Sequence, residues 1–148
     1  MTYSVIAFDA ESGAYGIGVQ SHWFNVGRSV PWARFGVGAV VTQALTDPSY
    51  GWRGLDAMAS GLAPREALDC LLAGDDEADR RQVAFMDSEG RVVVHTGARC
   101  LRVAGHQIRE GWAVLGNMLW DESVLPAMAR SFESASGTLA EQIVEALA

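Results

Sequence analysis

The N-terminal part of the chain alternates between apolar and polar side chains with a period of two. Residues 2–9 follow this pattern, and so do residues 14–21, in which Gly16 and Gly18 share one face. A period of two is typical of a β-strand. The short turn at Gly13 favours an antiparallel hairpin, because glycine adopts positive φ without strain. Two glycines on one face of a strand indicate close approach of another backbone or of a ligand.

The rest of the chain predicts a buried strand, two helices, more strands and two further helices. Residues 37–43 are nearly all apolar, as in a strand buried on both faces. Pro64 favours a first helical position, Ser123 can cap a helix, and Thr138 with Glu141 fits a capping box. The pattern predicts strands over 82–87, 91–96 and 112–115, helices beginning near Leu55, Pro64, Ser123 and Thr138, and no regular element over 22–34.

Strands and helices therefore occur in separate runs along the sequence. Such segregation indicates an α+β fold, with helices layered on mostly antiparallel sheet. The short hairpin loops disfavour a doubly wound parallel sheet. A length of 148 residues is that of one domain, which we expect to span residues 1–148.

Composition excludes several classes of protein. Hydrophobic residues make up 49% of the chain and charged residues 20%, which excludes intrinsic disorder. No apolar run approaches the about 20 residues of a membrane span. The N-terminus has neither the basic flank nor the apolar stretch of a signal peptide. The sequence therefore predicts a cytoplasmic protein.

Charge narrows the partners further. All 11 basic residues are arginine, and 18 acidic residues give a net charge of -7. Nucleic acid and anionic membranes are therefore not expected as partners, because both require clustered cations. The absence of lysine excludes chemistry that uses a lysine amine. Cys70 and Cys100 are too few for a disulfide framework and suit a reducing compartment. Cys70 lies on a helical stripe and is expected in the core.

Thr2 is the sharpest candidate for catalysis. If Met1 is removed, Thr2 becomes the N-terminal residue, and its α-amine can serve as base for its own hydroxyl. Such a residue must open a strand, and Thr2 does. Threonine is also common at position two without any catalytic role. If Met1 is retained, the amine is blocked where it is needed.

Other polar candidates lie in loops and at strand ends. Asn117 could donate to an oxyanion or orient an amide. Each candidate taken alone is equally typical of a hydrogen-bonded loop residue. His95, Cys100 and His106 lack the short spacing of structural zinc ligands, so neither a metal nor a cofactor is predicted. The candidates for substrate binding are Ser21, His22, Gln43, Asp47, Gln82, His95 and His106.

A series of short motifs runs in order along nearly the whole chain. It comprises Thr2-Tyr3-Ser4-Val5-Ile6-Ala7, Gly18-Val19-Gln20-Ser21, Val30-Pro31-Trp32-Ala33, Gly36-Val37-Gly38-Ala39, Thr42-Gln43-Ala44, Tyr50-Gly51 with Gly54-Leu55, Arg81-Gln82, His95-Thr96-Gly97, Cys100, Gly105-His106 and Gly116-Asn117. This series resembles the domain-of-unknown-function 1028 family, which is grouped with the N-terminal nucleophile (Ntn) hydrolases.

The resemblance implies a four-layer αββα sandwich, with two antiparallel sheets between layers of helices. It also implies that Thr2 is the nucleophile, that its own amine is the base, and that Asn117 and backbone N–H groups hold the oxyanion. Proteasome-like enzymes of this kind use a lysine near the nucleophile, and this chain has none.

The resemblance also bears on the C-terminal end. Family members continue beyond the last helix into further strands, whereas this sequence ends at Ala148. We therefore expect a domain that is C-terminally shortened relative to the family and lacks the last strands. An exposed sheet edge recruits other chains, which favours a homo-oligomer.

Three functions remain open from the sequence. The first is an Ntn-type hydrolase of a small amide or ureido C–N bond. The second is a non-catalytic member of the same fold that binds a small molecule or a partner and retains Met1. The third is a different enzyme that uses His95, Cys100 or His106. The state of Met1 discriminates between the first two hypotheses.

Overall fold

The computed structural model describes residues 1–148 and contains two four-stranded antiparallel sheets and four α-helices. One sheet has the order β2-β1-β8-β7, and the other has the order β3-β4-β5-β6. The strands are β1 (Thr2–Asp9), β2 (Ala14–Ser21), β3 (Pro31–Arg34), β4 (Gly38–Ala44), β5 (Arg81–Asp87), β6 (Val92–Thr96), β7 (Gly105–Arg109) and β8 (Trp112–Asn117). The helices are α1 (Ser49–Ala59), α2 (Pro64–Ala73), α3 (Val124–Ser134) and α4 (Leu139–Leu147), with short 3₁₀ turns η1 (Val26–Arg28) and η2 (Ala78–Arg80).

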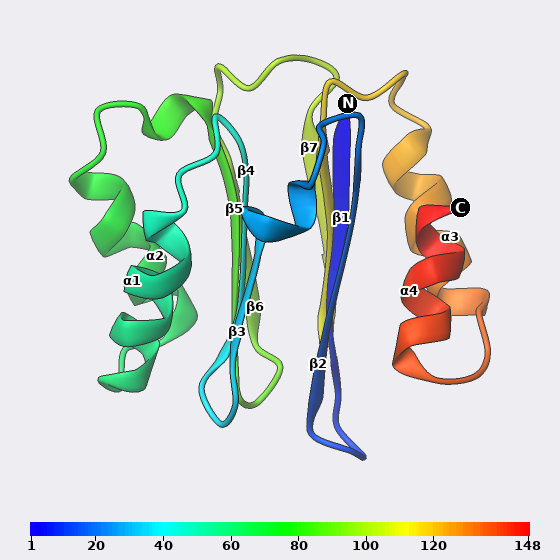
Figure 1. Ribbon diagram of the computed structural model, residues 1–148, viewed down its shortest axis with the longest axis horizontal. Coiled ribbons are helices and arrows are strands. Elements are labelled where there is room, and N and C mark those ends of the chain that lie inside the picture. The colour runs from blue at the N-terminus through cyan, green and yellow to red at the C-terminus, as the bar shows by residue number, and fades with distance from the viewer.

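The sheets lie face to face, and helices cover both outer faces (Figure 1). Helices α1 and α2 pack on the sheet that contains β4 and β5, and α3 and α4 pack on the sheet that contains β1 and β8. The predicted α+β architecture of antiparallel sheets and helices is thus confirmed. None of the helices has the length and apolar composition that a membrane span requires.

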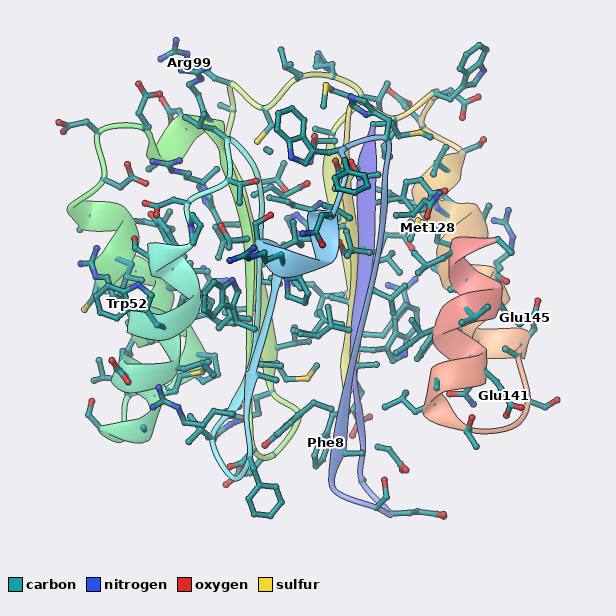
Figure 2. All side chains as sticks on the ribbon, in the orientation of Figure 1. Phe8, Trp52, Arg99, Met128, Glu141 and Glu145 are labelled. Carbon is teal, nitrogen blue, oxygen red and sulfur yellow. The ribbon has the colours of Figure 1, made fainter.

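Three apolar layers hold these elements together. The central layer lies between the sheets and includes the fully buried Ile6, Val41 and Leu115. The two outer layers join each sheet to its own helices. Figure 2 shows Met128 of α3 directed toward the neighbouring sheet, whereas Glu141 of α4 lies on the outer side. The apolar periodicity of each element therefore matches the layer that it faces.

The glycine face of β2 is covered by helix α4. A Cβ atom built on Gly16 would lie 2.4 Å from Cδ1 of Ile143, and one built on Gly18 would lie 2.3 Å from Cγ2 of Ile143. The expected close approach is present, but it is made by helix side chains. The prediction of a backbone or a ligand on this face is therefore wrong.

Two strands fall where the sequence did not predict them. β3 lies inside the segment 22–34, and β7 lies in the stretch that contains His106. Both are edge strands of four and five residues. An edge strand pairs on one side only and needs no continuous apolar pattern, which explains why hydropathy did not reveal them.

The helix starts agree with the sequence at Thr138 and differ in detail at Ser123. Thr138 and Glu141 form the predicted capping box. Ser123 occupies the N-cap position of α3, but its hydroxyl donates to Asp121 Oδ1 and does not cap the helix. Cys70 is exposed, so its prediction as a core residue is wrong. It lies outside the buried stripe of α2.

Candidate functional site

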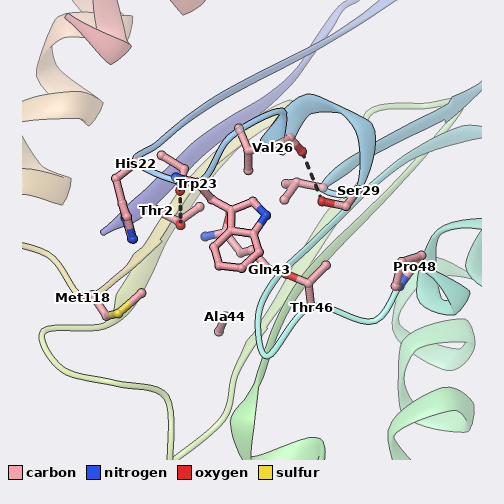
Figure 3. A pocket seen from close by; sticks show the side chains of 12 residues that line it. Thr2, His22, Trp23, Val26, Ser29, Gln43, Ala44, Thr46, Pro48 and Met118 are labelled. Atoms are coloured by element: carbon pink, nitrogen blue, oxygen red, sulfur yellow. Dashed lines mark hydrogen bonds between the residues drawn. The ribbon is translucent and has the colours of Figure 1, made fainter.

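A pocket of about 510 Å³ opens at one end of the two sheets. The antiparallel register explains its position, because β1 begins where its two neighbours end. Thr2 pairs with Ser21 on one side and with Asn117 on the other. The pocket is lined by Thr2, Ser21, His22, Trp23, Val26, Ser29, Val30, Gln43, Ala44, Thr46, Pro48 and Met118. Figure 3 shows the indole of Trp23 among these side chains.

The hydroxyl of Thr2 is held by Ser21. The two oxygen atoms are 2.9 Å apart, and Ser21 Oγ also lies 3.2 Å from the Met1 carbonyl oxygen. When Ser21 donates its proton to this carbonyl, Thr2 must donate to Ser21. The lone pairs of Thr2 Oγ1 are then free to react with a group in the pocket.

Met1 is tied to the same corner of the pocket. Its α-amine lies 3.3 Å from His22 Nδ1, and its carbonyl accepts the Ser21 hydroxyl. In this form the backbone nitrogen of Thr2 is part of a peptide bond and cannot act as a base. Removal of Met1 would place a free amine at the start of β1, next to the hydroxyl of Thr2.

Below the pocket, Gln82 is the centre of a buried polar network. Its Nε2 donates to the carbonyl oxygens of Gly105 and Gly116, both at 2.9 Å. A carbonyl can only accept, so these contacts fix the orientation of the Gln82 amide. Its Oε1 then accepts from Gln43 at 2.8 Å and from Asn117 at 3.1 Å. One N–H of Asn117, a residue that is 1% exposed, is therefore directed toward Gln82.

Gln43 is equally engaged with the protein interior. Its Oε1 accepts from the buried Ser4 hydroxyl at 2.6 Å, and its Nε2 donates to Gln82. Gln43 and Gln82 are 1% and 0% exposed. Gln43 thus contributes a wall of the pocket, and Gln82 can act on a substrate only through the side chains that it holds.

Two residues at the pocket have backbone conformations that non-glycine residues rarely adopt. Ala44 at the end of β4 has φ 68°, and Met118 after β8 has φ 51°. Such conformations cost of order 1–3 kcal/mol and persist only when surrounding contacts enforce them. Both residues also line a second hollow of about 250 Å³ beside the pocket. They therefore form the wall between two adjoining cavities.

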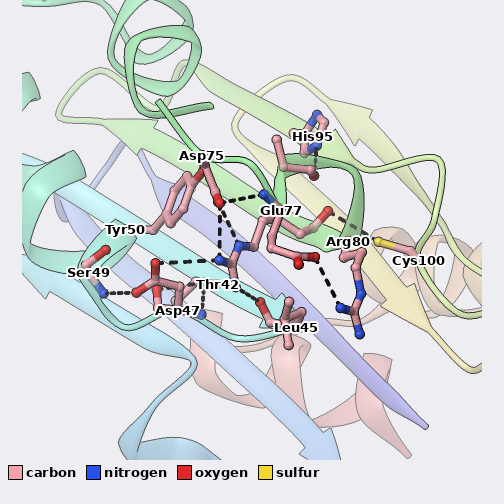
Figure 4. Close-up of polar contacts among 12 residues, drawn as sticks. Thr42, Leu45, Asp47, Ser49, Tyr50, Asp75, Glu77, Arg80, His95 and Cys100 are labelled. Carbon is pink, nitrogen blue, oxygen red and sulfur yellow. Dashed lines mark hydrogen bonds and ion pairs between the residues drawn. The ribbon is translucent and has the colours of Figure 1, made fainter. Parts of the chain in front are cut away.

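A polar cluster around Arg81 braces the same end of the sheets (Figure 4). Arg81 Nε donates to Asp75 at 2.7 Å, and its Nη1 donates to the Leu45 carbonyl at 2.7 Å. Arg81 lowers the pKa of Asp75 to about 2. Burial, together with the Asp75 carboxylate, raises the pKa of the Tyr50 hydroxyl. The cluster ties the start of β5 to the loop that follows β4.

The structure brings some of the predicted site residues together and separates others. Thr2, Ser21, His22 and Gln43 line the pocket, and Asn117 lines the second hollow. Gln82 lies beneath them. Asp47 lies apart, where its carboxylate accepts from the Ser49 backbone N–H at 2.9 Å and faces Arg81.

The two later histidines lie outside the pocket. His95 Nε2 is 2.9 Å from the Ala78 carbonyl oxygen, and His106 Nδ1 is 2.9 Å from Thr96 Oγ1. Loss of surrounding water lowers the pKa of His106, and the charges of His95 and Arg65 lower it further. Through Thr96, His106 connects to Gln82 and not to the pocket itself.

Eight of the residues that line the pocket were not candidates from the sequence: Trp23, Val26, Ser29, Val30, Ala44, Thr46, Pro48 and Met118. Trp23 directly follows the candidate His22 in the sequence, and this adjacency could have indicated that Trp23 lines the pocket. Ala44 and Met118 carry no polar group, and nothing in their residue types indicates positive φ. The structure contains no group of three or more His, Cys, Asp or Glu side chains arranged to hold a metal ion.

Comparison with known proteins gives the family. The model of the "Family of unknown function (DUF1028)" matches residues 2–148. The chain belongs to this family. Among solved structures, protein SPO2555 from Silicibacter pomeroyi, which carries the same DUF1028 designation, matches with a TM-score of 0.94 and 29% sequence identity. The match covers 99% of this chain and 68% of that one. No curated protein matches the chain.

Proposed function

We propose that this DUF1028 protein is a cytoplasmic N-terminal nucleophile hydrolase that cleaves a small amide or ureido C–N bond. Under this proposal the helix–sheet–sheet–helix arrangement is an Ntn-type αββα sandwich. One observation carries the proposal. The hydroxyl of Thr2 lies in a pocket at the first residue of a central strand, and Ser21 holds it at 2.9 Å.

The reaction begins once Met1 has been removed. The α-amine of Thr2, whose pKa is ordinarily about 7.7–8.0, accepts the proton of the Thr2 hydroxyl. Oγ1 attacks the carbonyl carbon, and the C–N bond breaks as the amine returns the proton to the leaving nitrogen. Water then attacks the resulting ester, and its cleavage releases the acid and restores the Thr2 hydroxyl.

Asn117 supports the charge that develops on the carbonyl oxygen. It pairs with Thr2 across adjacent strands, and its inward N–H is held by Gln82. The second N–H is therefore oriented before the substrate binds. A preorganised donor of this kind stabilises an oxyanion more than a mobile donor does. Gln82 is a positioning residue in this scheme, because it acts through Asn117.

The lining of the pocket favours an uncharged reacting group. No Asp, Glu or Arg side chain lines it, and Trp23, Val26, Val30, Pro48 and Met118 supply apolar surface. A charged group would lose water without gaining an ionic partner there. The pocket volume of about 510 Å³ lies within the range of about 300–1,000 Å³ that is typical of small-molecule sites, which agrees with a small-molecule amide or ureide.

The first experiment establishes whether the nucleophile exists. The intact mass of the purified protein reports whether Met1 is absent. Periodate cleaves the bond between carbons that carry a free amine and an adjacent hydroxyl, so it oxidises Thr2 only if Thr2 is N-terminal. We expect both results in active protein. Full hydrolytic activity with Met1 still attached would end the proposal.

The second experiment tests reactivity. A small β-lactone, which acylates a nucleophilic hydroxyl without a leaving group, is expected to form one adduct that maps to Thr2. Thr2→Ser should retain the adduct and Thr2→Ala should lose it. Thr46→Ala is the matched control, because Thr46 lines the same pocket and has no role in the scheme. An adduct that persists in Thr2→Ala would assign the nucleophile elsewhere.

One observation favours a second candidate function. The amine and carbonyl of Met1 are both bound by side chains of the pocket, His22 and Ser21. This arrangement suits a small-molecule-binding or interaction member of the family that keeps Met1. That protein would show the full mass, resist periodate and form no lactone adduct at Thr2, while still binding ligands in the pocket.

A further inference from the structure

The second hollow differs from the Thr2 pocket in its charge. Its lining includes Arg80, Arg99 and Asn117, and no Asp or Glu side chain lines it. The chain as a whole carries 18 acidic residues against 11 arginines. This hollow, which is lined by two arginines and no carboxylate, is therefore locally basic in a protein whose net charge is negative. We propose that this hollow is an anion-binding subsite that takes a carboxylate of the substrate.

The two arginines are available to a ligand in different ways. Arg80 contacts Glu77 at 3.1 Å, and both side chains are close to half exposed. Such surface pairs contribute about 0–1 kcal/mol, so a carboxylate can compete for Arg80. Arg99 forms no ion pair in the structure, and Figure 2 shows it at the end of the sheets where the N-terminus also lies. Arg80 therefore supplies part of the wall, and Arg99 supplies a free guanidinium at the rim.

Two neighbouring groups, Arg81 and Cys100, do not alter the basic character of the hollow. Arg81 is adjacent in sequence, but Asp75 and the Leu45 carbonyl occupy its guanidinium. Cys100 lines the hollow, and its thiol donates to the Arg81 carbonyl at 3.2 Å. Burial raises the pKa of this thiol, which keeps it uncharged. No fixed negative charge in the lining opposes an anion.

The position of the hollow connects it to the proposed chemistry. It shares Ala44 and Met118 with the Thr2 pocket, and it is also lined by Asn117, the last residue of β8, which pairs with Thr2. A ligand that places an amide at Thr2 can therefore extend a charged end past Ala44 and Met118. The inference rests on the proposed function and specifies its substrate class, which is an amide or ureide that carries a carboxylate.

The test uses binding, so it does not depend on turnover. Thr2→Ala protein is titrated with succinamate and with succinamide, which have the same size and amide but differ in one carboxylate. Calorimetry at constant ionic strength measures both affinities. Because hydrogen bonds to charged groups contribute about 1.5–3 kcal/mol, we expect succinamate to bind at least about tenfold more tightly.

Variants assign the preference to the hollow. Arg80→Gln and Arg99→Gln, together or singly, should reduce the preference for succinamate, whereas Arg130→Gln should retain it. Arg130 lies on α3 and forms no ion pair, so this control makes the same change in net charge at a distant surface. Thermal unfolding without ligand should be nearly unchanged in Arg99→Gln, because no protein partner is lost.

The possible results separate this inference from the nucleophile. A carboxylate preference in Thr2→Ala that the arginine variants abolish supports the subsite, whatever the lactone experiment shows. Equal binding of the two compounds, binding of neither, or a preference that survives both arginine substitutions would overturn it. Displacement of succinamate by sulfate at constant ionic strength would identify a general anion site without a carboxylate-specific arrangement, and would also overturn the substrate class.

Discussion

Substitution of Gln82 should show how strongly the buried network holds the candidate site. Gln82→Met keeps the length of the side chain but removes both polar atoms. The N–H groups of Gln43 and Asn117 then lose the acceptor that lies 2.8 and 3.1 Å away. Each buried donor left without a partner costs about 1–3 kcal/mol, so these two donors alone should lower the free energy of unfolding by about 2–6 kcal/mol. The carbonyls of Gly105 and Gly116 also lose the donor that Nε2 supplies.

Gln82→Glu tests the amide orientation itself, because it places a carboxyl oxygen against the carbonyls of Gly105 and Gly116. Burial and these oxygens favour the protonated acid, which raises the folded-state pKa above the unfolded value of about 4.3. Above the unfolded pKa, the folded state therefore binds the extra proton. As the pH rises from the unfolded-state pKa to the folded-state pKa, the free energy of unfolding of Gln82→Glu should fall by about 1.4 kcal/mol per pH unit.

The assay is urea denaturation followed by tryptophan fluorescence at several pH values. Gln20→Glu is the control, because Gln20 is an exposed strand residue that undergoes the same chemical change. Gln20→Glu should follow the wild-type pH profile, and Gln82→Met should differ from wild type by a nearly constant amount. A Gln82→Glu profile parallel to wild type, or a loss below about 1 kcal/mol in Gln82→Met, would refute the network as described.

Three further predictions concern the rest of the molecule. Gly16→Ala should cost about 1–3 kcal/mol by overpacking. Ile143→Val should relieve part of this cost, because valine lacks Cδ1 while Leu139 Cδ2 still lies 2.9 Å from the added Cβ; it should not relieve Gly18→Ala, because valine keeps Cγ2. A double-mutant cycle in urea measures both effects. The lowered pKa of Asp75 contributes on the order of 2 kcal/mol to the free energy of unfolding, and this contribution is present above about pH 4 and lost toward pH 2. Asp75→Asn should therefore lose less stability on acidification than wild type does. Light scattering should give a mass above 15.9 kDa, as expected for a homo-oligomer; a monomer at high salt would reject that expectation.

Much of the fold follows from hydropathy because each element has a side that must be buried. β1 and β2 have the predicted bounds, β5 and β6 differ from theirs by one residue at one end, and β4 is shifted by one residue at both ends. β3 and β7 are edge strands whose pattern is set by pairing and not by burial, so periodicity could not reveal them. The sequence also could not show that α4 covers the face of β2 that carries Gly16 and Gly18, because this contact depends on where α4 packs in the folded protein.

The sequence identified four of the residues that line the pocket but could not show where they meet. Thr2, Ser21 and Asn117 are far apart in sequence, yet each lies at a strand terminus, which is where polar side chains can leave a packed sheet without breaking its core. Antiparallel pairing then decides which termini coincide, and the register places Ser21 and Asn117 on either side of Thr2. His95 also lies near the end of a strand, but β6 is the edge of the other sheet, which separates it from the pocket.

The same geometry explains why the pocket and the second hollow open at one end of the two sheets. At that end β1 begins while β2, β4 and β8 finish, so the start of β1 and several strand-terminal side chains meet there. Ala44 and Met118 leave their strands at positive φ and open cavities on either side of themselves. The network around Gln82 closes the floor and joins the two sheets beneath these cavities. Under the proposed function, a substrate would meet a buried polar floor, an apolar pocket at Thr2 and a basic hollow beyond it, and selectivity would arise from spanning both.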